Sequence, residues 1–350
     1  MSGEPGPPAE VLAAWGLVDA AVTVEQIGAG LINATFAVTD VGGAKMILQR
    51  VNPIFAPEIH RNIAAVTAAL ARAGVATPQL IPSVDGGLWH ADQGAIWRMQ
   101  EAIDGVSFNA LVSPAQARAA ARFVGRWHAA LADLDHEFVG LRAGVHDTPT
   151  HLAKLERAVA EGGGHRLFGP VEGLARALLD AAAGLENLPA CPLWVAHGDL
   201  KINNLLFAGT DEVGRLEPVA LIDLDTVGPM SLAYELGDMW RSWSNRATED
   251  EPQARVDLDL FEASWSGWVE GLGREIDGRE RRALVLGPEW ISLELAARFC
   301  ADAIFEDYFG WDRARFAGRG EHNLARARSQ WSLHRVLVAS RAERAAVLGV

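Results

Sequence analysis

The 350-residue sequence has very little cysteine. Its two cysteines, Cys191 and Cys300, lie more than a hundred positions apart. In a chain of this length they cannot form the disulfide framework that holds small secreted domains together. The composition therefore excludes the disulfide-rich class and predicts a protein of the reducing cytoplasm.

The sequence also lacks any apolar run long enough to span a bilayer. Its first residues, MSGEPGPPAEVLAAWGL, carry no basic leader ahead of their short apolar stretch. We therefore expect neither membrane insertion nor export. With 49% hydrophobic residues, the chain can still bury a large core and form two lobes.

An excess of positive charge is absent as well, since the formal net charge is −14. Proteins that bind nucleic acid normally present a clustered basic face, which releases counterions from the phosphate backbone. The charge balance therefore argues against a nucleic-acid partner. It is compatible with a cationic small-molecule substrate, and it does not indicate an oligomeric state.

Internal repeats are missing too, but the pattern of the chain changes near residue 102. Before it, β-like segments surround one amphipathic helix that runs from Pro57 to Gly74. The predicted strands cover 22–28, 34–38, 44–50 and 93–101, and the predicted helices cover about 113–135, 150–162, 170–187, 230–243, 253–272, 288–307 and 322–346. The pattern predicts an α+β fold with a small strand-rich lobe, residues 1–101, a one-strand hinge and a large helical lobe, residues 102–350.

The stretch WVAHGDLKINNLLF, residues 194–207, places polar residues between two apolar flanks. Such a loop suits phosphoryl transfer, because Asp199 can accept or orient a hydroxyl proton and Asn204 can ligate magnesium. Lys201 lies between them and can neutralise charge on the transferred phosphoryl group. Taken alone, this spacing is more often an ordinary turn. His197 and Asn203 are expected to be scaffolding of the loop.

A second stretch, ALIDLDTVG at 220–228, favours the catalytic interpretation. Asp223 ends an apolar strand, and a hairpin return would bring it beside Asn204 as a second oxygen ligand for magnesium. Asp225 is on the same side of an extended chain, so it is a candidate for a second metal or for the substrate. An acidic turn is the alternative for Asp225.

The stretch EQIGAGLINATFAV places Gly28 and Gly30 between two predicted strands. Backbone without side chains can fold closely over phosphates and donate N–H groups to them. A plain hairpin turn is the commoner meaning of such a pair. Its position ahead of the other motifs is that of a kinase nucleotide loop.

Taken together, G-A-G-L-I-N, H-G-D-L-K-I-N-N and I-D-L-D resemble the aminoglycoside phosphotransferase/choline kinase superfamily, which has a protein-kinase-like bilobal fold. Further stretches resemble its N-acetylhexosamine 1-kinase branch: ILQRVNPIF, RNIAAVT, WRMQEAIDG, HDTP, IDLDTVGP, ELGDMWR and EHNLARARSQWSL. The resemblance covers most of the chain.

This resemblance implies the cofactors ATP and Mg²⁺, with transfer of the γ-phosphoryl group to the anomeric 1-hydroxyl of an N-acetylated hexosamine. Asp199 would be the base and Lys201 a charge stabiliser, with Asn204, Asp223 and secondarily Asp225 as metal ligands. The adenine would lie against the hinge backbone, with Met99 as an apolar neighbour. The alternative for Met99 is an ordinary core residue. The expected nucleotide-binding residues are Gly28, Gly30, Asn33, Gln49, Arg50, Gln100 and Ala102.

The sequence departs from the kinase pattern at the third strand. Protein kinases pair a lysine there with a glutamate on the next helix, whereas this strand ends Leu48-Gln49-Arg50 and the helix carries Asn62. Gln49 with Asn62, or Arg50 with a phosphate, are the candidate substitutes, and a solvated strand end is the alternative for Arg50. Leu31 and Ser242 depart from the hexosamine-kinase pattern, which affects the identity of the sugar.

The acceptor site is expected around Leu31, Asp199, Asp238, Arg241 and Arg298. Arg298 lies on a mostly apolar helix, where it either pairs with an acid such as Glu294 or Asp302, the favoured alternative, or holds an acceptor oxygen. Two residue groups are expected outside the site: His128 and the tryptophans in the core, and Arg326 and Arg328 on a solvated face.

Two other classes of function remain open. One is the same catalyst with another acceptor, such as an aminoglycoside, choline, homoserine or a neutral sugar. The other is a non-catalytic nucleotide-binding regulator, which the retention of Asp199, Asn204 and Asp223 disfavours.

Overall fold

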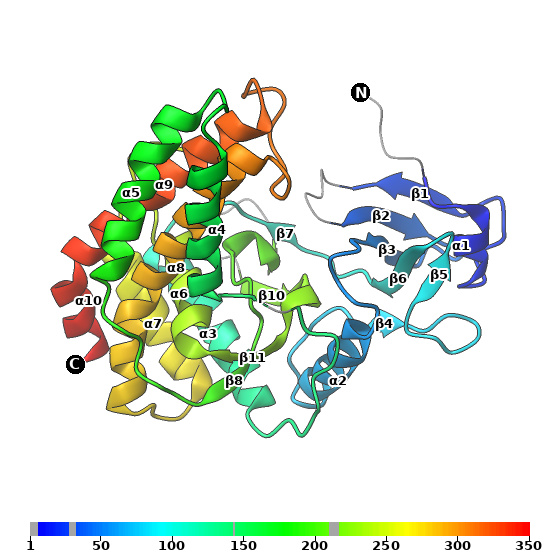
Figure 1. The fold of residues 1–350 in the computed structure, drawn as a ribbon. Helices are drawn as coiled ribbons and strands as arrows, with labels where there is room; N and C mark the ends of the chain where they lie inside the picture. The colour runs from blue at the N-terminus through cyan, green and yellow to red at the C-terminus, as the bar shows by residue number, and fades with distance from the viewer. Residues whose placement is uncertain (1–5, 28–32, 143, 210–216) are drawn as a thin grey trace.

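The computed structural model describes residues 6–27, 33–142, 144–209 and 217–350. A β-rich N-terminal region lies beside a larger, mostly helical region (Figure 1). The predicted α+β class, with its strand-rich first part and helical second part, is confirmed. The last long strand of the first region ends at Glu101, and the limits of two separate domains stay a prediction. No helix among the described residues is long and apolar enough to cross a membrane.

The N-terminal region is built on one antiparallel sheet with the strand order β1-β2-β3-β6-β4, and β5 also pairs with β6. Its elements are α1 (Ala9–Ala13), β1 (Thr23–Gln26), β2 (Ala34–Thr39), β3 (Lys45–Val51), α2 (Ile59–Arg72), β4 (Leu80–Ile81), β5 (His90–Asp92) and β6 (Ala95–Glu101). The four predicted strands and the single predicted helix are therefore present.

One face of this sheet forms a small core of its own. Alternate residues along the strands point to the same face, and Phe36, Leu48, Trp97 and Met99 are buried there against Val11 of α1. Met99 is thus a core residue. The residues between them, such as Arg98, point to the opposite face of the sheet.

Helix α2 belongs to a different core. Its apolar residues Ile59, Ile63, Val66 and Leu70 recur at three- and four-residue spacing, as in an amphipathic helix. They join the large hydrophobic cluster of the C-terminal region rather than the small core of the sheet. The helix therefore fastens the end of β3 to the helical region.

The C-terminal region contains helices and two short sheets, with strand orders β10-β9-β7 and β11-β8. Its elements are β7 (Val106–Ser107), α3 (Pro114–Leu131), α4 (Thr148–Glu161), α5 (Phe168–Ala183), β8 (Leu193–Ala196), β9 (Leu205–Ala208), β10 (Glu217–Leu221), β11 (Gly228–Ser231), α6 (Leu232–Trp243), α7 (Leu258–Leu272), α8 (Gly278–Phe305), α9 (Arg319–Ala339) and α10 (Arg341–Leu348), with short 3-10 turns η1 (Ile202–Asn204) and η2 (Leu224–Thr226).

Helices α3 and α7 pack with their backbones unusually close. A Cβ atom added at Gly267 would lie 2.1 Å from the carbonyl oxygen of Arg118, and one at Gly125 would lie 2.2 Å from that of Trp268. Both positions therefore require glycine. These helices belong to a hydrophobic core with large buried aromatic side chains, among them Trp127, Trp240 and Trp268.

Two predicted helix starts are wrong, and one predicted helix is divided in two. Helix α8 begins at Gly278, ten residues before the prediction, because Asp277 caps it by accepting from the backbone N–H groups of Arg279 and Glu280. The helix continues through Pro288. Helix α7 begins at Leu258, where Asp257 provides the cap. The last predicted helix is two helices, α9 and α10, which meet at Ser340.

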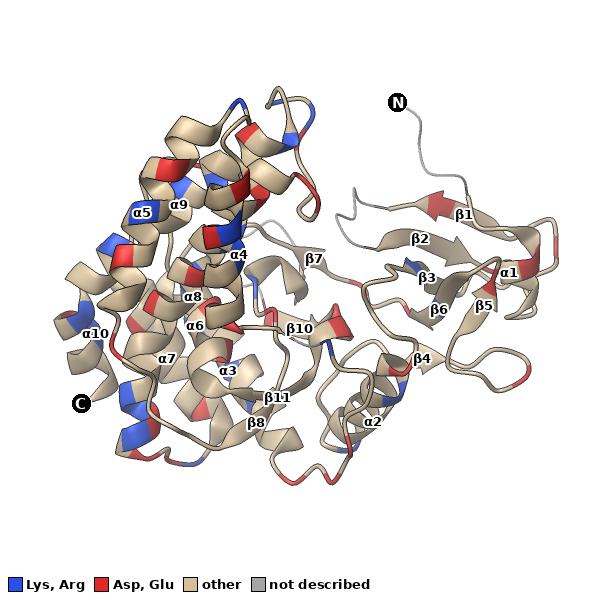
Figure 2. Ribbon diagram, in the orientation of Figure 1, with Lys and Arg blue, Asp and Glu red and all other residues tan. Residues whose placement is uncertain are grey.

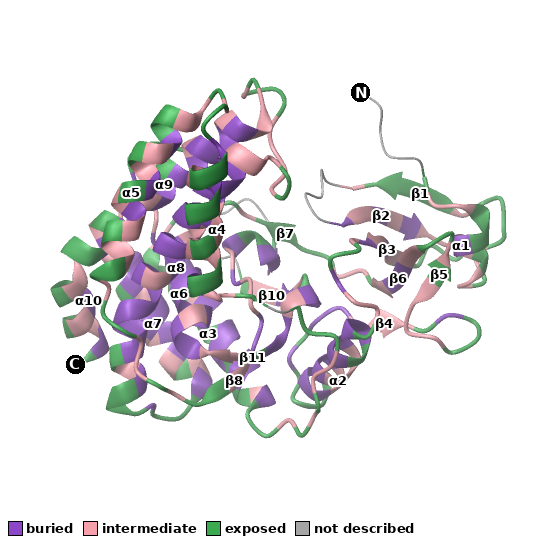
Figure 3. Cartoon of the chain, in the orientation of Figure 1, coloured by how far each residue is buried: buried purple, intermediate pink, exposed green. Residues whose placement is uncertain are grey.

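Basic and acidic residues are interspersed over the helical region (Figure 2). Figure 3 shows that the buried residues lie mainly on the faces where the helices meet one another. Both cysteines are free thiols, and Cys300 is buried, as expected for a chain without a disulfide framework.

Candidate functional site

The predicted catalytic loop follows β8, which ends at Ala196 and pairs with β11. Gly198 has φ +82°, and a Cβ atom there would lie 2.7 Å from the carbonyl oxygen of Thr226. Glycine is therefore required at this turn. The hydroxyl of Thr226 donates to the carbonyl oxygen of His197 at 2.8 Å. These contacts hold the start of the loop against the turn that follows β10.

A buried carboxylate that the sequence analysis missed anchors this loop. Glu235 on α6 accepts from the backbone N–H groups of His197 at 2.8 Å and Gly198 at 2.9 Å. His128 donates to the same carboxylate at 3.2 Å, since its other ring nitrogen accepts from Trp268. Burial opposes ionisation, but these hydrogen bonds and the nearby histidines lower the pKa of Glu235 below its ordinary value.

His197 is a scaffold residue, as predicted. It is fully buried, and its Nε2 donates to the carbonyl oxygen of Ile222 at 2.8 Å. Its Nδ1 then accepts from the backbone N–H of Asp199 at 3.2 Å. The imidazole therefore ties the catalytic loop to the strand end before Asp223 and is not available for proton transfer.

The structure brings Asp199, Lys201 and Asn204 together. The ammonium group of Lys201 lies 2.9 Å from Oδ2 of Asp199. Although burial acts in the other direction, the carboxylates of Asp199 and Asp238 raise the pKa of Lys201. The amide nitrogen of Asn204 donates to the backbone oxygen of Asp199 at 2.8 Å and approaches its Oδ2 at 3.3 Å. This use of the nitrogen leaves the amide oxygen of Asn204 for another ligand.

The predicted hairpin return places Asp223 beside this group. Strands β9 and β10 pair with Leu205 opposite Leu221, and the backbone N–H of Ile222 donates to the carbonyl oxygen of Asn204 at 2.9 Å. Asp223 itself has φ +65°, a left-handed conformation that is uncommon for a side chain other than glycine. Its carboxylate is solvent-accessible and makes no hydrogen bond with the part of the chain that the structure describes.

The surroundings of Asp223 shift its titration. Reduced hydration at this junction, followed by the negative charges of Asp225 and Asp199, raises the pKa of Asp223 to about 6. A divalent cation would relieve this repulsion. Asp223 and the amide oxygen of Asn204 are hard oxygen donors of the kind that magnesium prefers.

These residues fit a magnesium ion only together with a substrate. Within the described ranges, no three histidine, cysteine, aspartate or glutamate side chains are grouped to hold a metal. Magnesium usually completes its octahedron with water and phosphate oxygens instead of an all-protein cage. One aspartate and one asparagine are therefore a sufficient protein contribution.

Asp225 is in a different situation from Asp223. Its Oδ1 accepts from Arg98 of β6, and its Oδ2 accepts from the side-chain amide of Asn33 at 2.6 Å. All three side chains are buried. Both oxygens of Asp225 are thus bound by residues of the N-terminal region, and its role as a metal ligand stays a prediction.

The predicted nucleotide residues that the structure describes lie on or beside the sheet, next to the turn of residues 223–226, which we call the metal loop. Gln49 accepts from Nε of Arg98 at 2.9 Å and contacts Gln100 at 3.3 Å. Arg50 is half-buried near the end of β3, and Ala102 directly follows β6. Gly28, Gly30 and Leu31 lie outside the described residues.

Gln49 and Asn62 do not bond to each other. The side chain of Asn62 donates to the carbonyl oxygen of Val139 at 2.7 Å and accepts from the backbone N–H of the same residue at 3.0 Å. It also contacts His136 at 3.0 Å. Asn62 therefore fastens α2 to the loop after α3, and the residue that the sequence analysis missed beside Gln49 is Arg98.

Three of the predicted acceptor residues lie on helices, Asp238 and Arg241 on α6 and Arg298 on α8. Nε of Arg241 donates to Oδ1 of Asp238 at 2.8 Å, and both side chains are buried. The backbone N–H of Ile202 in the catalytic loop lies 3.4 Å from the hydroxyl of Ser242, so α6 contacts the loop directly. The second oxygen of Asp238 is buried without a hydrogen-bond partner in the described structure.

Arg298 pairs with Glu294, the alternative that the sequence analysis favoured, at 3.5 Å. Glu294 is fully buried and also accepts from the hydroxyl of Thr148 at 2.7 Å and from His146 at 3.2 Å. The ring of His146 stacks on Tyr234 of α6. Despite its burial, the hydrogen bond and charge of His146 and the charge of Arg298 lower the pKa of Glu294.

The expectation that Arg326 faces solvent is wrong. It is buried, it donates to the carbonyl oxygen of Gly310 at 2.8 Å and it lies 3.4 Å from Glu249. Glu249 is also 4.0 Å from Arg241. Arg328 is exposed, as expected. We call Asp238, Arg241, Glu249, Glu294, Arg298 and Arg326 the acceptor-side cluster.

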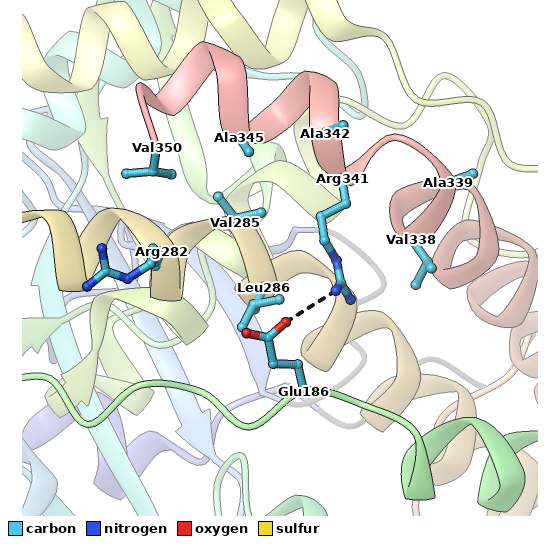
Figure 4. Close-up of a pocket in the computed structure, with 10 residues that line it drawn as sticks. All are labelled: Glu186, Arg282, Val285, Leu286, Val338, Ala339, Arg341, Ala342, Ala345 and Val350. Atoms are coloured by element: carbon cyan, nitrogen blue, oxygen red, sulfur yellow. Dashed lines mark hydrogen bonds and ion pairs between the residues drawn. The ribbon is translucent and has the colours of Figure 1, made fainter.

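A separate hollow of ≈ 470 Å³ lies between α8, α9 and α10 (Figure 4). Its wall contains apolar residues such as Val285 and Val338 and the exposed ion pair of Arg341 with Glu186 at 3.3 Å. None of the predicted site residues lines it. The hollow is therefore not part of the candidate active site.

Comparisons with solved structures show the same fold. An aminoglycoside phosphotransferase from Alicyclobacillus acidocaldarius subsp. acidocaldarius DSM 446 is 17% identical, with a TM-score of 0.60 over 99% of this chain and 98% of that one. A microcompartment-associated aminopropanol kinase is also 17% identical, with a TM-score of 0.63 over 95% and 97%. The amicoumacin kinase hAmiN, in complex with AMP-PNP, Ca²⁺ and Ami, is 11% identical, with a TM-score of 0.57 over 89% and 88%.

The family itself follows from the sequence. Residues 23–271 match the family APH, described as the phosphotransferase enzyme family. The matched range begins with β1 and ends within α7, so it contains the catalytic loop, the metal loop and α6. This chain belongs to the phosphotransferase enzyme family.

Proposed function

We propose that this chain is a cytoplasmic kinase that uses ATP and Mg²⁺ to phosphorylate a hydroxyl group of a small neutral polyhydroxyl acceptor. The first candidate is the anomeric 1-hydroxyl of an N-acetylhexosamine. The observation that carries the proposal is the convergence of Asp199, Lys201, Asn204 and Asp223 in one site, with Asp223 left without a hydrogen bond in the described structure.

Each of these residues has one task in the proposed reaction. Asp199 accepts the proton of the acceptor hydroxyl, or orients that hydroxyl for in-line attack on the γ-phosphorus. Lys201 neutralises the negative charge that develops on the phosphoryl oxygens. Asn204 and Asp223 would hold Mg²⁺, which would compensate the negative charge of the phosphate oxygens when bound. An anomeric hydroxyl is more acidic than an ordinary alcohol, so a carboxylate of ordinary basicity suffices as its acceptor.

The nucleotide is assigned to the junction of the two regions. The backbone after β6, from Gln100 to Ala102, is the proposed adenine contact. Gln100 and Asp223 line the same small cavity, so a nucleotide that begins at this backbone would have its phosphates near the metal loop. The AMP-PNP and Ca²⁺ bound by the amicoumacin kinase of the same fold support a nucleotide with a divalent cation.

The charges of the acceptor-side cluster favour a neutral acceptor. Asp238 pairs with Arg241, Glu294 with Arg298 and Glu249 with Arg326. A site for a quaternary or primary ammonium group would need unpaired carboxylates or an aromatic cage. Paired charges instead offer fixed donors and acceptors, which suit the hydroxyl and acetamide groups of a sugar.

An amino alcohol or an aminoglycoside is the second candidate. The unpartnered oxygen of Asp238 is the feature that favours it, because a buried carboxylate oxygen can receive an N–H donor of a cationic acceptor. The names of the aminopropanol kinase and the aminoglycoside phosphotransferase of the same fold agree with this class.

An ATP-consumption screen separates the candidates. The purified protein would be given Mg·ATP with N-acetylhexosamines, plain hexoses, amino alcohols, choline, homoserine and aminoglycosides. We expect the highest kcat/KM with an N-acetylhexosamine and a product phosphorylated at the anomeric oxygen, as assigned by NMR. Phosphate on any other oxygen rules out the 1-kinase assignment, and turnover with only cationic acceptors favours the second candidate.

A further inference from the structure

Arg98 is a buried cation between the N-terminal sheet and the metal loop. Only 1% of the residue is exposed. One guanidinium nitrogen donates to Oδ1 of Asp225, and Nε donates to Oε1 of Gln49 at 2.9 Å. An arginine cannot shed its charge when it is buried, so it must keep an anionic partner. Asp225 is that partner.

The strand register explains why Arg98 points to this place. Residues 97 and 99 of β6 face the small core of the sheet, so residues 98 and 100 face the opposite side. Gln49 is directly opposite Arg98 in the β3–β6 pairing. Arg98 therefore extends from β6, the strand that pairs with the third strand, β3. It lies beside the position on the third strand where protein kinases carry their lysine.

Arg98 is also close to the group that is left free for a ligand. Arg98, Gln100 and Asp223 line one small cavity, together with Ile63 of α2 and Leu224 of η2. The ring of His60 on α2 is buried near the same guanidinium. Burial first, and then the positive charge of Arg98, lower the pKa of His60 to about 4. A cation at residue 98 is thus in contact with the sheet and the metal loop, and close to α2.

Most buried side chains of the sheet form a core apart from the large one, which takes in only Val51 of the buried sheet residues, so polar contacts add to the few apolar ones between them. The large hydrophobic cluster takes in α2 and the helical region, while Trp97 and Met99 belong to the small cluster of the sheet. The Arg98–Asp225 ion pair and the hydrogen bond from Asn33 to Asp225 join that sheet directly to η2.

We propose that Arg98 is a positioning residue of the kinase site, and that its ion pair with Asp225 holds η2 so that Asp223 faces Asn204. In this arrangement Asp225 serves as the anchor of the metal loop and Asp223 as the metal ligand. Protein kinases form an ion pair between a third-strand lysine and a glutamate on the next helix. This chain lacks both residues, and the Arg98–Asp225 ion pair takes the place of that pair. This inference rests on the proposed function, because it concerns how that metal site is aligned.

The test compares Arg98→Gln, Asp225→Asn and the double variant with the unaltered protein. The measurements are the affinity for AMP-PNP by calorimetry and the Mg²⁺ concentration that gives half of the maximal binding, neither of which needs an acceptor. Arg61→Gln is the matched control, because Arg61 is an exposed arginine on α2 of the same region. It should leave both values unchanged.

We expect each single substitution to raise the required Mg²⁺ concentration on the order of tenfold. The double variant should need no more Mg²⁺ than the worse single variant, because the effects of two substitutions in one ion pair are strongly non-additive. Arg98→Lys should restore part of the loss, since it keeps the charge but lacks the planar fork with which arginine bonds Asp225 and Gln49. If Arg98→Gln does not fold, Arg98→Lys and Asp225→Asn carry the comparison.

Other outcomes overturn the inference. Additive losses would mean that Asp225 binds a metal and Arg98 a phosphate independently. An unchanged Mg²⁺ requirement in Arg98→Gln, with only a lower melting temperature, would reduce the pair to a structural contact. If the unaltered protein binds no Mg·AMP-PNP, the proposed function itself fails, whereas normal binding with insensitive variants refutes only the role of Arg98.

Discussion

The catalytic loop and the acceptor-side cluster use charge in opposite ways. In the loop, Asp199 has one oxygen near Lys201 and Asn204, and Asp223 has no hydrogen bond within the described residues. In the cluster, Asp238 and Glu294 are buried and each is paired with an arginine. The difference indicates where a charged ligand is expected. Phosphate and metal fit the loop, while the proposed acceptor site is a surface whose charges are already compensated.

The largest effect should come from Asp199→Asn, which tests the catalytic loop, the first of the two compared regions. Loss of a general base is expected to lower kcat by about 10²- to 10⁴-fold, while the affinity for Mg·AMP-PNP stays close to that of the unaltered protein. Steady-state kinetics and calorimetry measure the two values. Asp180→Asn on the exposed side of α5 is the matched control. Undiminished turnover in Asp199→Asn would contradict the assigned mechanism.

The second prediction concerns the support of the loop. In Glu235→Gln, one oxygen that accepts from the backbone of His197 or Gly198 becomes an N–H₂ group, which leaves a buried donor unsatisfied. The free energy of unfolding should fall by about 1–3 kcal/mol, and kcat should fall because the backbone before Asp199 is no longer fixed. Urea unfolding and kinetics at saturating substrates measure both.

The control for this variant is Glu270→Gln, which alters an exposed carboxylate that pairs with Arg118 and Arg122. It should change neither stability nor kcat measurably. A normal kcat in Glu235→Gln, together with reduced stability, would show that the buried carboxylate supports the fold without aligning the catalytic aspartate.

The third prediction concerns the paired charges of the acceptor-side cluster. Arg298→Gln removes the arginine cation beside Glu294 and leaves the carboxylate with His146, Thr148 and His151 as neighbours. The KM for an N-acetylhexosamine should rise severalfold, and the relative kcat/KM for cationic amino alcohols should increase, because the site gains net negative charge. The KM for ATP should not change. Equal losses for neutral and cationic acceptors would refute this charge argument.

The sequence predicted the two parts of the comparison to different degrees because their contacts differ in range. Asp199, Lys201 and Asn204 are within six residues of one another, and the hairpin that brings Asp223 back is short, so spacing alone was informative. The ion pair of Arg98 with Asp225 joins residues 127 positions apart. It depends on the β3–β6 register, which no local pattern specifies. An arginine inside the apolar strand 95–101 was the available signal.

The helix limits that were wrong have a similar cause. The proline at 288 suggests a helix start, because it lacks an N–H donor. Asp277 offers a better start, as its carboxylate accepts two backbone N–H groups. Arg326 was expected in solvent because a charged helix face usually is, yet it is buried in contact with Gly310 and Glu249. Such contact with distant segments is a property of the tertiary structure.

The smallest effect is expected for Arg315→Gln, which tests whether pairing matters outside the buried cluster. Arg315 contacts Asp250 at 2.6 Å, but 58% of its side chain is exposed, and Asp250 also contacts His322. Only the Arg315 partner is exposed, but water and salt still screen an ion pair at the surface, so stability should fall by at most about 1 kcal/mol. Urea unfolding at low and high salt measures it, and the remaining difference should shrink as the salt concentration rises. A loss as large as that of Glu235→Gln would mean that this pair holds the segment beside the acceptor-side cluster in place, and the distinction between buried and exposed pairs would have to be redrawn.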